Sequence, residues 1–325
     1  MKNIVIVGGG TGTLTLLSGL RSYPSNNSVI VSTADSGGST GQLRADFGII
    51  PPGDIRQCLL GLSFTDEVIQ KLFAHRFAKG SLKGHNVGNI ILAALMQIEK
   101  TPESAIARAA KLLNVRGSVV PVTLFPTTLS ATLENGKKIV GEHDIDEPKH
   151  NGSLKIKDIK LDKVKPANPR ALKLLKEADV VVFGPGDLFT STIPNVLVAD
   201  VKKTLQASKA TKVFVTNVMT KHGQTNNFKA SDFVQTFEKF AGFKIDVVIA
   251  NTAKPKPAII AKYKKEKATF VEADVKTLEA KGYKVFAEPL ISESTFAKDK
   301  SDMLARSFLR HDSKKIAKIL WDLVS

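Results

Sequence analysis

The chain has 325 residues and a formal net charge of +16, and 42% of its residues are hydrophobic against 24% charged. These proportions are typical of a soluble globular protein and exclude an intrinsically disordered chain. The single cysteine, Cys58, excludes an intramolecular disulfide, and the apolar runs are far shorter than the ~20 residues that span a bilayer. We therefore expect a cytoplasmic protein with no membrane-inserted segment.

The positive charge is concentrated in the second half of the chain, which could indicate a nucleic-acid partner. The lysines there are dispersed among acidic residues, as on solvated helix faces, and only 6% of all residues are aromatic. A platform for stacking RNA bases needs aromatic side chains. We interpret the charge as surface and predict no nucleic-acid partner.

Nearly continuous runs of Val and Ile predict parallel strands buried on both faces. They lie at 4–7, 29–32, 119–124, 180–184, 212–216 and 246–250. Helix-like stretches alternate with them at 13–20, 89–97, 102–113, 169–177, 196–206 and 231–241, and a last helix follows Asp312. This alternation predicts an α/β fold with a doubly wound, mostly parallel, Rossmann-like sheet.

Residues 115–167 break the alternation, because helix signals disappear there. The Asn135-Gly136 pair between two apolar stretches predicts a hairpin over 131–140, and 156–165 resembles a further strand. We expect a small β-rich elaboration within a single domain that covers residues 1–325.

The first candidate site follows the first strand and opens a helix. Glycines at such a turn let the backbone approach a phosphate, and the helix N-terminus supplies N–H donors. The spacing fits neither the dinucleotide fingerprint nor a Walker A loop. A purely structural turn is the alternative. The candidate residues are Gly8, Gly9, Gly10, Thr11, Gly12 and Thr13.

The second candidate site follows the second strand. Asp35 lies 25 residues after Gly10, near the place where dinucleotide folds hold ribose hydroxyls with an acid. The Gly/Ser run after it predicts a second backbone cradle for phosphate or sugar hydroxyls. The candidate residues are Asp35, Ser36, Gly37, Gly38 and Ser39.

Two weaker candidates open later helices. Asp54 has the character of an N-cap, and Arg56 offers a bidentate fork to a phosphate or carboxylate. His85, Asn86 and Asn89 form a polar helix start, for which capping by Asn89 is the structural alternative.

Further candidates follow strands in the second half of the chain. Asp187 is suited to sugar hydroxyls or a divalent cation, with neighbouring polar side chains completing the lining. The candidate residues are Gly184, Pro185, Gly186, Asp187, Ser191, Asn195, Asn217 and Asn251. Because parallel strands end at one edge of a sheet, we expect all these loops to surround one ligand.

At these residues the chain resembles the CofD-like family, and within it the YvcK-type branch of gluconeogenesis factors. The resemblance rests on six blocks in the family's order that span almost the whole chain. They are GGGTGT at 8–13, TADSGGSTGQLR at 33–44, PPGDIRQC at 51–58, GHNVGN at 84–89, GPGDLFTSTIPN at 184–195 and TNVMTKHGQT at 216–225.

The family's founding activity is 2-phospho-L-lactate transfer from a nucleotide-activated donor. The resemblance to the YvcK-type branch implies instead binding of UDP-sugars and a regulatory role in central carbon metabolism, cell shape and cell-wall synthesis. Two positions depart from the branch, since Ser36 stands where a second Asp is usual and Gln42 where Arg is usual. The loss of one carboxylate weakens a paired-Asp metal site there.

Three functions therefore stay open: a nucleotide-sugar-binding regulator, a transferase with a nucleotide diphosphate donor, and an NAD-dependent oxidoreductase. The glycine spacing disfavours the oxidoreductase. A transferase would use Mg²⁺ at Asp35, Asp54 or Asp187; no other cofactor and no catalytic residue is predicted. The expected partner is a nucleotide or nucleotide sugar, and a homo-oligomer and regulatory proteins stay open as protein partners.

Overall fold

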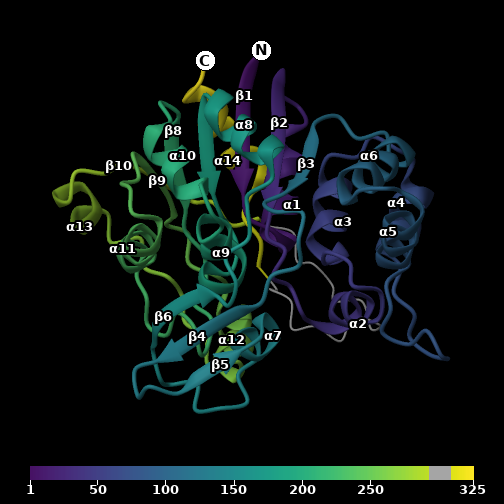
Figure 1. The fold of residues 1–325 in the computed structure, drawn as a ribbon. Helices are drawn as coiled ribbons and strands as arrows, with labels where there is room; N and C mark the ends of the chain where they lie inside the picture. Colours follow the sequence, from purple (N-terminus) through teal and green to yellow (C-terminus); the bar gives the residue numbers. More distant parts are fainter. Residues whose placement is uncertain (293–308) are drawn as a thin grey trace.

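The computed structural model describes residues 1–292 and 309–325, so residues 293–308 of the expected domain 1–325 lie outside the described part. Its centre is a seven-stranded parallel sheet in the order β3-β2-β1-β7-β8-β9-β10 (Figure 1). The strands are β1 (Lys2–Val7), β2 (Ser25–Val31), β3 (Ser118–Pro121), β7 (Val180–Phe183), β8 (Thr211–Val215), β9 (Val247–Asn251) and β10 (Lys284–Glu288). The predicted fold class is confirmed.

The strand order reverses at β1, which pairs with β2 on one side and with β7 on the other. At such a reversal the connections leave the carboxyl ends of neighbouring strands in opposite directions and open a crevice where ligands bind. The loops that follow β1 and β7 form this crevice.

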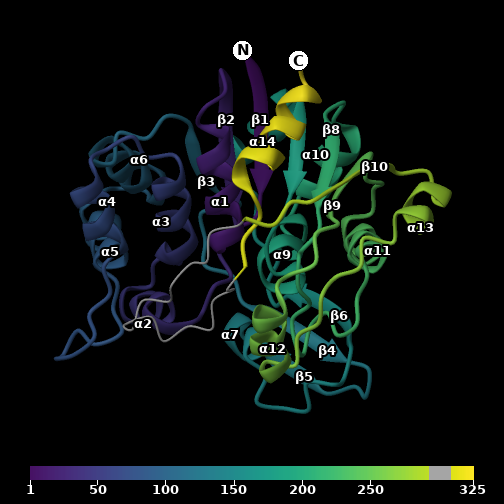
Figure 2. The same cartoon turned by 180° about the vertical axis from the view of Figure 1, so that it is seen from behind.

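Alternate residues of each strand pack on opposite faces of the sheet, as the pleat requires. Ile4 and Ile6 pack in the core with the helices of one layer, of which Figure 2 shows α14 in front of β1. Val5 and Val7 contact the other layer. The first layer contains α1 (Gly10–Leu20), α3 (Pro52–Gly61), α5 (Val87–Ile98), α6 (Pro102–Leu112) and α14 (Ser313–Asp322), and the second α8 (Pro169–Glu177), α9 (Ile193–Val196), α10 (Val201–Ala207) and α11 (Ala230–Ala241).

A second, antiparallel sheet lies beyond the carboxyl ends of the large sheet (Figure 1). Its order is β5 (Lys138–Val140), β4 (Leu129–Leu133), β6 (Ile156–Leu161), and the predicted hairpin and strand are confirmed. Leu129 and Ile159 share one buried cluster with the large sheet's side chains. This continuous core favours the single domain with an elaboration at 115–167, which stays a prediction.

Four local predictions need correction. The segment 115–167 also holds a helix, α7 (Glu142–Asp146), and the expected cradle after β2 passes into α2 (Gly38–Phe47). The helix expected at 196–206 is interrupted after Val196 and resumes as α10. The cap of α5 is Asn86, whose side chain accepts the N–H of Asn89 at 3.2 Å.

The remaining helices are α4 (Glu67–Ala74), α12 (Pro257–Lys265), α13 (Val275–Ala280) and the π-helical turn η1 (Leu188–Thr192). Within residues 1–292 and 309–325, none of the helices is long and apolar enough to cross a membrane.

Candidate functional site

A cleft of about 800 Å³ lies at the carboxyl edge of the large sheet, between the loops after β1, β2, β7 and β8 and the helix α7. This is the edge at which parallel sheets bind ligands. The loops from both halves of the chain thus come together, as expected, although their role in binding stays a prediction. The predicted residues that line the cleft are Gly9, Gly10, Thr11, Gly12, Asp35, Gly37, Ser39, Asp54, Arg56, Asn89, Pro185, Gly186, Asp187, Ser191 and Asn217.

The floor of the cleft is made by close contact between the loops after β1 and β7. A Cβ at Gly12 would lie 2.3 Å from the carbonyl oxygen of Pro185, so only glycine allows the two loops to meet this closely. Gly10 has a φ of +74°, a conformation that glycine adopts without strain. The glycines therefore join the two halves of the crevice as well as opening α1.

Asp54 does not cap its own helix, because α3 begins at Pro52 with Pro51 as N-cap. Its carboxylate instead reaches the N-terminus of α1 and accepts a hydrogen bond from the N–H of Gly10. Burial and the nearby Asp35 carboxylate raise the pKa of Asp54 to about 7. Part of the positive helix end that was predicted for a phosphate is thus occupied by a side chain of the protein.

Asp35 is held by two donors at the start of α2. It accepts the N–H of Gly37 at 2.9 Å and a hydrogen bond from the Thr40 side chain. Burial is the largest influence on its pKa, which is raised above the ordinary value, and the charge of Asp146 acts in the same direction.

Ser36, the position that departs from the resemblance, connects the loop after β2 to α7. Its hydroxyl accepts the N–H of His143 at 3.0 Å, and its own N–H donates to Glu142 at 3.2 Å. Burial, followed by the charges of Asp35 and Asp146, raises the pKa of Glu142 to about 9. Glu142 is therefore protonated at neutral pH.

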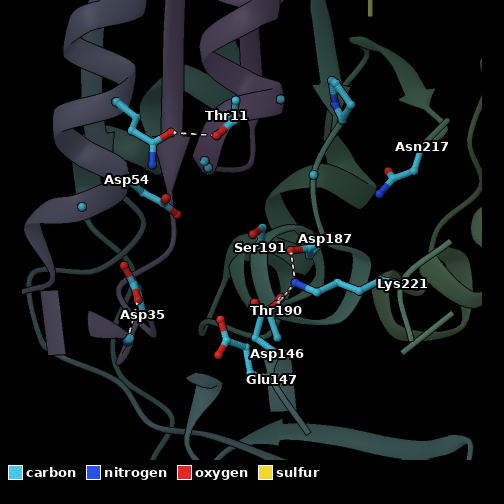
Figure 3. A pocket seen from close by; sticks show the side chains of 18 of the residues that line it. Thr11, Asp35, Asp54, Asp146, Glu147, Asp187, Thr190, Ser191, Asn217 and Lys221 are labelled. Atoms are coloured by element: carbon cyan, nitrogen blue, oxygen red, sulfur yellow. Dashed lines mark hydrogen bonds and ion pairs between the residues drawn. The ribbon is translucent and has the colours of Figure 1, made fainter. Parts of the chain in front are cut away.

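Lys221, in the loop after β8, lies between two carboxylates in the centre of the cleft (Figure 3). Its ammonium group is 2.8 Å from Asp187 and 2.5 Å from Asp146. Burial opposes the charged form of Lys221, but the two carboxylates outweigh it and raise its pKa. The ion pairs join α7 to the ends of β7 and β8.

The part of the cleft lining that comes from the first half of the chain also contains a buried polar pair, with one residue on α3 and one on α5. The Nε of Arg56 donates to Asn89 at 2.9 Å, and Asn89 in turn lies 3.4 Å from the Thr40 hydroxyl. This pair brings together two candidates that are far apart in the sequence. His85 is 3.3 Å from the Ser39 hydroxyl but does not line the cleft.

Nine predicted site residues lie outside the lining, and several have structural roles. Thr13 is fully buried and donates to the carbonyl of Gly9 at 3.1 Å, and Asn251 accepts the N–H of Leu290 at 2.9 Å. The residues outside the lining are Gly8, Thr13, Ser36, Gly38, His85, Asn86, Gly184, Asn195 and Asn251.

The carboxylates of α7 are the main lining residues that the sequence analysis missed. The signal for them was the acidic run 142–147, directly after the predicted hairpin. Lys221 lies within the block TNVMTKHGQT at 216–225 but was not among the predicted site residues. Further missed lining residues are Thr40, Gln57, Arg76, His143, Glu147, Thr220, His222, Tyr263, Glu266, Arg310 and His311.

Asp35, Asp54 and Asp187, the alternative positions predicted for Mg²⁺, are not grouped within the described residues into a cage of three protein ligands. No group of three His, Cys, Asp or Glu side chains in the described parts of the chain is placed to hold a metal ion. Asp54 and Asp35 each accept a backbone N–H, and Asp187 pairs with Lys221. The donor set does not fit a metal cage made by the protein alone.

The parallel sheet and the cleft at its strand-order reversal define a Rossmann-like α/β protein with a cleft at the carboxyl edge. The sequence profile described as "2-phospho-L-lactate transferase CofD" matches residues 4–291. The chain belongs to this family.

Individual relatives match over nearly their whole length. A protein of Aquifex aeolicus, named "Putative gluconeogenesis factor", is 40% identical over 98% of this chain and 95% of its own. The "Gluconeogenesis factor" of Bacillus subtilis is 37% identical over 99% and 98%. The crystal structure of a UPF0052 family member from Bacillus halodurans has a TM-score of 0.90 at 35% identity, and the match covers 98% of each chain.

Proposed function

We propose that this protein binds a nucleotide sugar, of the UDP-sugar class, and acts as a cytoplasmic regulator of central carbon metabolism, cell shape and cell-wall synthesis. The observation that carries the binding proposal is the cleft itself. Glycine-rich and acidic loops from both halves of the chain line one space of about 800 Å³, which suits a ligand with a compact diphosphate and a hydroxylated group. The names of the relatives support the metabolic role.

The charge of the cleft also favours this ligand class over a polyanion. Seven Asp and Glu side chains line it against five Lys and Arg, and even with Glu142 protonated the cleft lacks the positive excess of the chain, whose formal net charge is +16. Carboxylates accept hydrogen bonds from sugar hydroxyls, whereas they repel a run of phosphates.

Thermal shift and isothermal titration with UDP-glucose test the proposal, because a ligand that binds only the folded state raises the melting temperature. We expect saturable binding that Asp35→Ala weakens by about 1.5–3 kcal/mol, the range for a hydrogen bond to a charged group. Exposed Asp46→Ala is the matched control. No shift with any UDP-sugar would contradict the proposal.

A second candidate is a transferase that uses a nucleotide diphosphate donor, and the family profile favours it. Incubation with UDP-sugar or an activated phospholactyl donor, Mg²⁺ and acceptors separates the two functions. Release of nucleotide at catalytic rates would contradict a pure regulator, and dependence of that release on the acceptor would support the transferase. Binding without turnover would support the regulator.

A further inference from the structure

One oxygen of Asp146 is saturated by the protein, whereas the other is not. Its Oδ1 receives Lys221, the hydroxyl of Thr190 at 3.1 Å and the amide of Gln224 at 3.0 Å. Within the described residues, no N–H or hydroxyl donor is hydrogen-bonded to Oδ2, and the Asp187 carboxyl is a further side-chain neighbour of this carboxylate. The side chain keeps 24% of its surface exposed and lines the cleft beside Asp187 (Figure 3). Asp146 is thus fixed in orientation and retains capacity to accept.

The positive charge nearest to Asp146 is already shared. Lys221 bonds to Asp146 and Asp187 together, so this group of three side chains has a net charge of −1 when both carboxylates are ionised. The charge of Asp146 raises the pKa of Asp35 and of Glu142, so both carboxyl groups lie within electrostatic range of it. A negatively charged group of a ligand would therefore face carboxylates here. Lys221, the cation of this group of three, is already paired with both of them.

We infer that the part of the cleft between α7 and η1 takes the sugar of the ligand, accepts hydroxyl donors on Asp146 and Asp187, and rejects a sugar that carries a carboxylate. This inference rests on the proposed nucleotide-sugar binding and assigns the selectivity of that site. A hydroxyl donates to the free carboxylate oxygen, whereas a carboxylate has no proton to give at neutral pH. Two negative charges repel each other most strongly where water is excluded.

UDP-glucose and UDP-glucuronate are a matched pair of probes, because they share the nucleotide and the ring and differ at one carbon, which carries a hydroxyl or a carboxylate. Titration of the full chain with each should give at least about tenfold tighter binding of UDP-glucose, a ratio equivalent to about 1.4 kcal/mol. Equal affinities would overturn the inference and leave the proposed function standing. Failure of both to bind would overturn the proposed function and the inference with it.

The variant Asp146→Asn tests whether the Asp146 side chain causes the selectivity. The amide keeps one acceptor oxygen, removes the charge and adds a donor, so we expect the affinity ratio to fall below about threefold, mainly through tighter binding of UDP-glucuronate. Asp46→Asn removes the charge of an exposed carboxylate outside the cleft lining and should leave the ratio unchanged. An unchanged ratio in folded Asp146→Asn would contradict the assignment, and Asp187→Asn provides the same test if the first variant does not fold.

Discussion

Glu142 shows how neighbouring groups change the chemistry of a single side chain. It faces a cleft that also holds Asp35 and Asp146, and burial together with these charges raises its pKa to about 9. The carboxyl of Glu142 therefore keeps its proton at neutral pH and can donate a hydrogen bond. The cleft thus contains ionised carboxylates that accept hydrogen bonds and one protonated carboxyl that can donate one. A hydroxyl of a ligand can pair with either kind of group.

The pKa of Glu142 has a consequence for stability. Because its folded-state pKa is raised, the stabilising contribution is complete below the ordinary value of 4.5 and is lost as the pH rises through about 9. Glu142→Gln, which cannot ionise, should therefore be more stable than the wild type at pH 9, by about 1 kcal/mol or more, and nearly equal to it at pH 5. Melting temperatures at both pH values measure this. The exposed Glu279→Gln is the control, and a constant difference between wild type and Glu142→Gln across the range would contradict the expectation.

At the scale of elements, the loops after β1 and β7 are built as one unit. Gly12 and Pro185 approach so closely that a side chain at position 12 would enter the backbone of the other loop. Such a contact explains a glycine within a helix, where glycine otherwise costs stability. The contact also fixes the position of Asp187, two residues after Pro185, relative to the start of α1.

Gly12→Ala should destabilise the fold. The added Cβ would lie 2.3 Å from a backbone carbonyl oxygen, and overpacking of this kind costs about 1–3 kcal/mol. Gly186→Ala is the matched control, because its nearest atom would lie at 3.5 Å, an ordinary contact, and its effect should be below about 1 kcal/mol. Denaturant unfolding of both variants compares them. Equal stability of the two would show that the loops can separate without cost.

The elements that the sequence predicted are those with a local signal. Continuous Val and Ile runs marked six strands of the large sheet, and Asn135-Gly136 marked the hairpin. The short helix α7 was missed because five residues carry little helical preference, and its place depends on bonds to Ser36 and Lys221. Likewise, β10 has an exposed edge and mixed polarity, so its sequence is not that of a buried strand.

The site residues likewise divide into those with a local sequence signal and those whose place depends on tertiary contacts. Glycines and acids directly after strands were predictable, since their position depends only on strand direction. Whether a polar side chain faces the cleft or the protein depends on tertiary contacts. Asn217 lines the cleft, whereas Asn251, the last residue of the neighbouring strand β9, accepts the N–H of Leu290.

For the whole molecule, the prediction is a ligand that touches both halves of the chain. Asn217→Ala should weaken UDP-glucose binding about two- to tenfold, the loss of one neutral hydrogen bond, although Asn217 lies far along the chain from Gly10. Asn26→Ala removes the same side chain from the opposite edge of the sheet and should bind normally. Titration of the two variants compares them directly. Normal binding by both Asn217→Ala and Asp187→Ala would confine the ligand to loops of the first half.

The pairing of Ile4 with Val180 also determines when the cleft is formed during synthesis. The first strand leaves the ribosome almost at once, but one of its two neighbours is made only after more than half of the chain. Until then, one edge of β1 stays unpaired and the crevice has a single wall. Non-local pairings of this kind form slowly and leave strand edges open to association with other chains. A ligand that contacts both halves of the chain would thus bind only after the two halves have met, and it would not assist the early steps of folding.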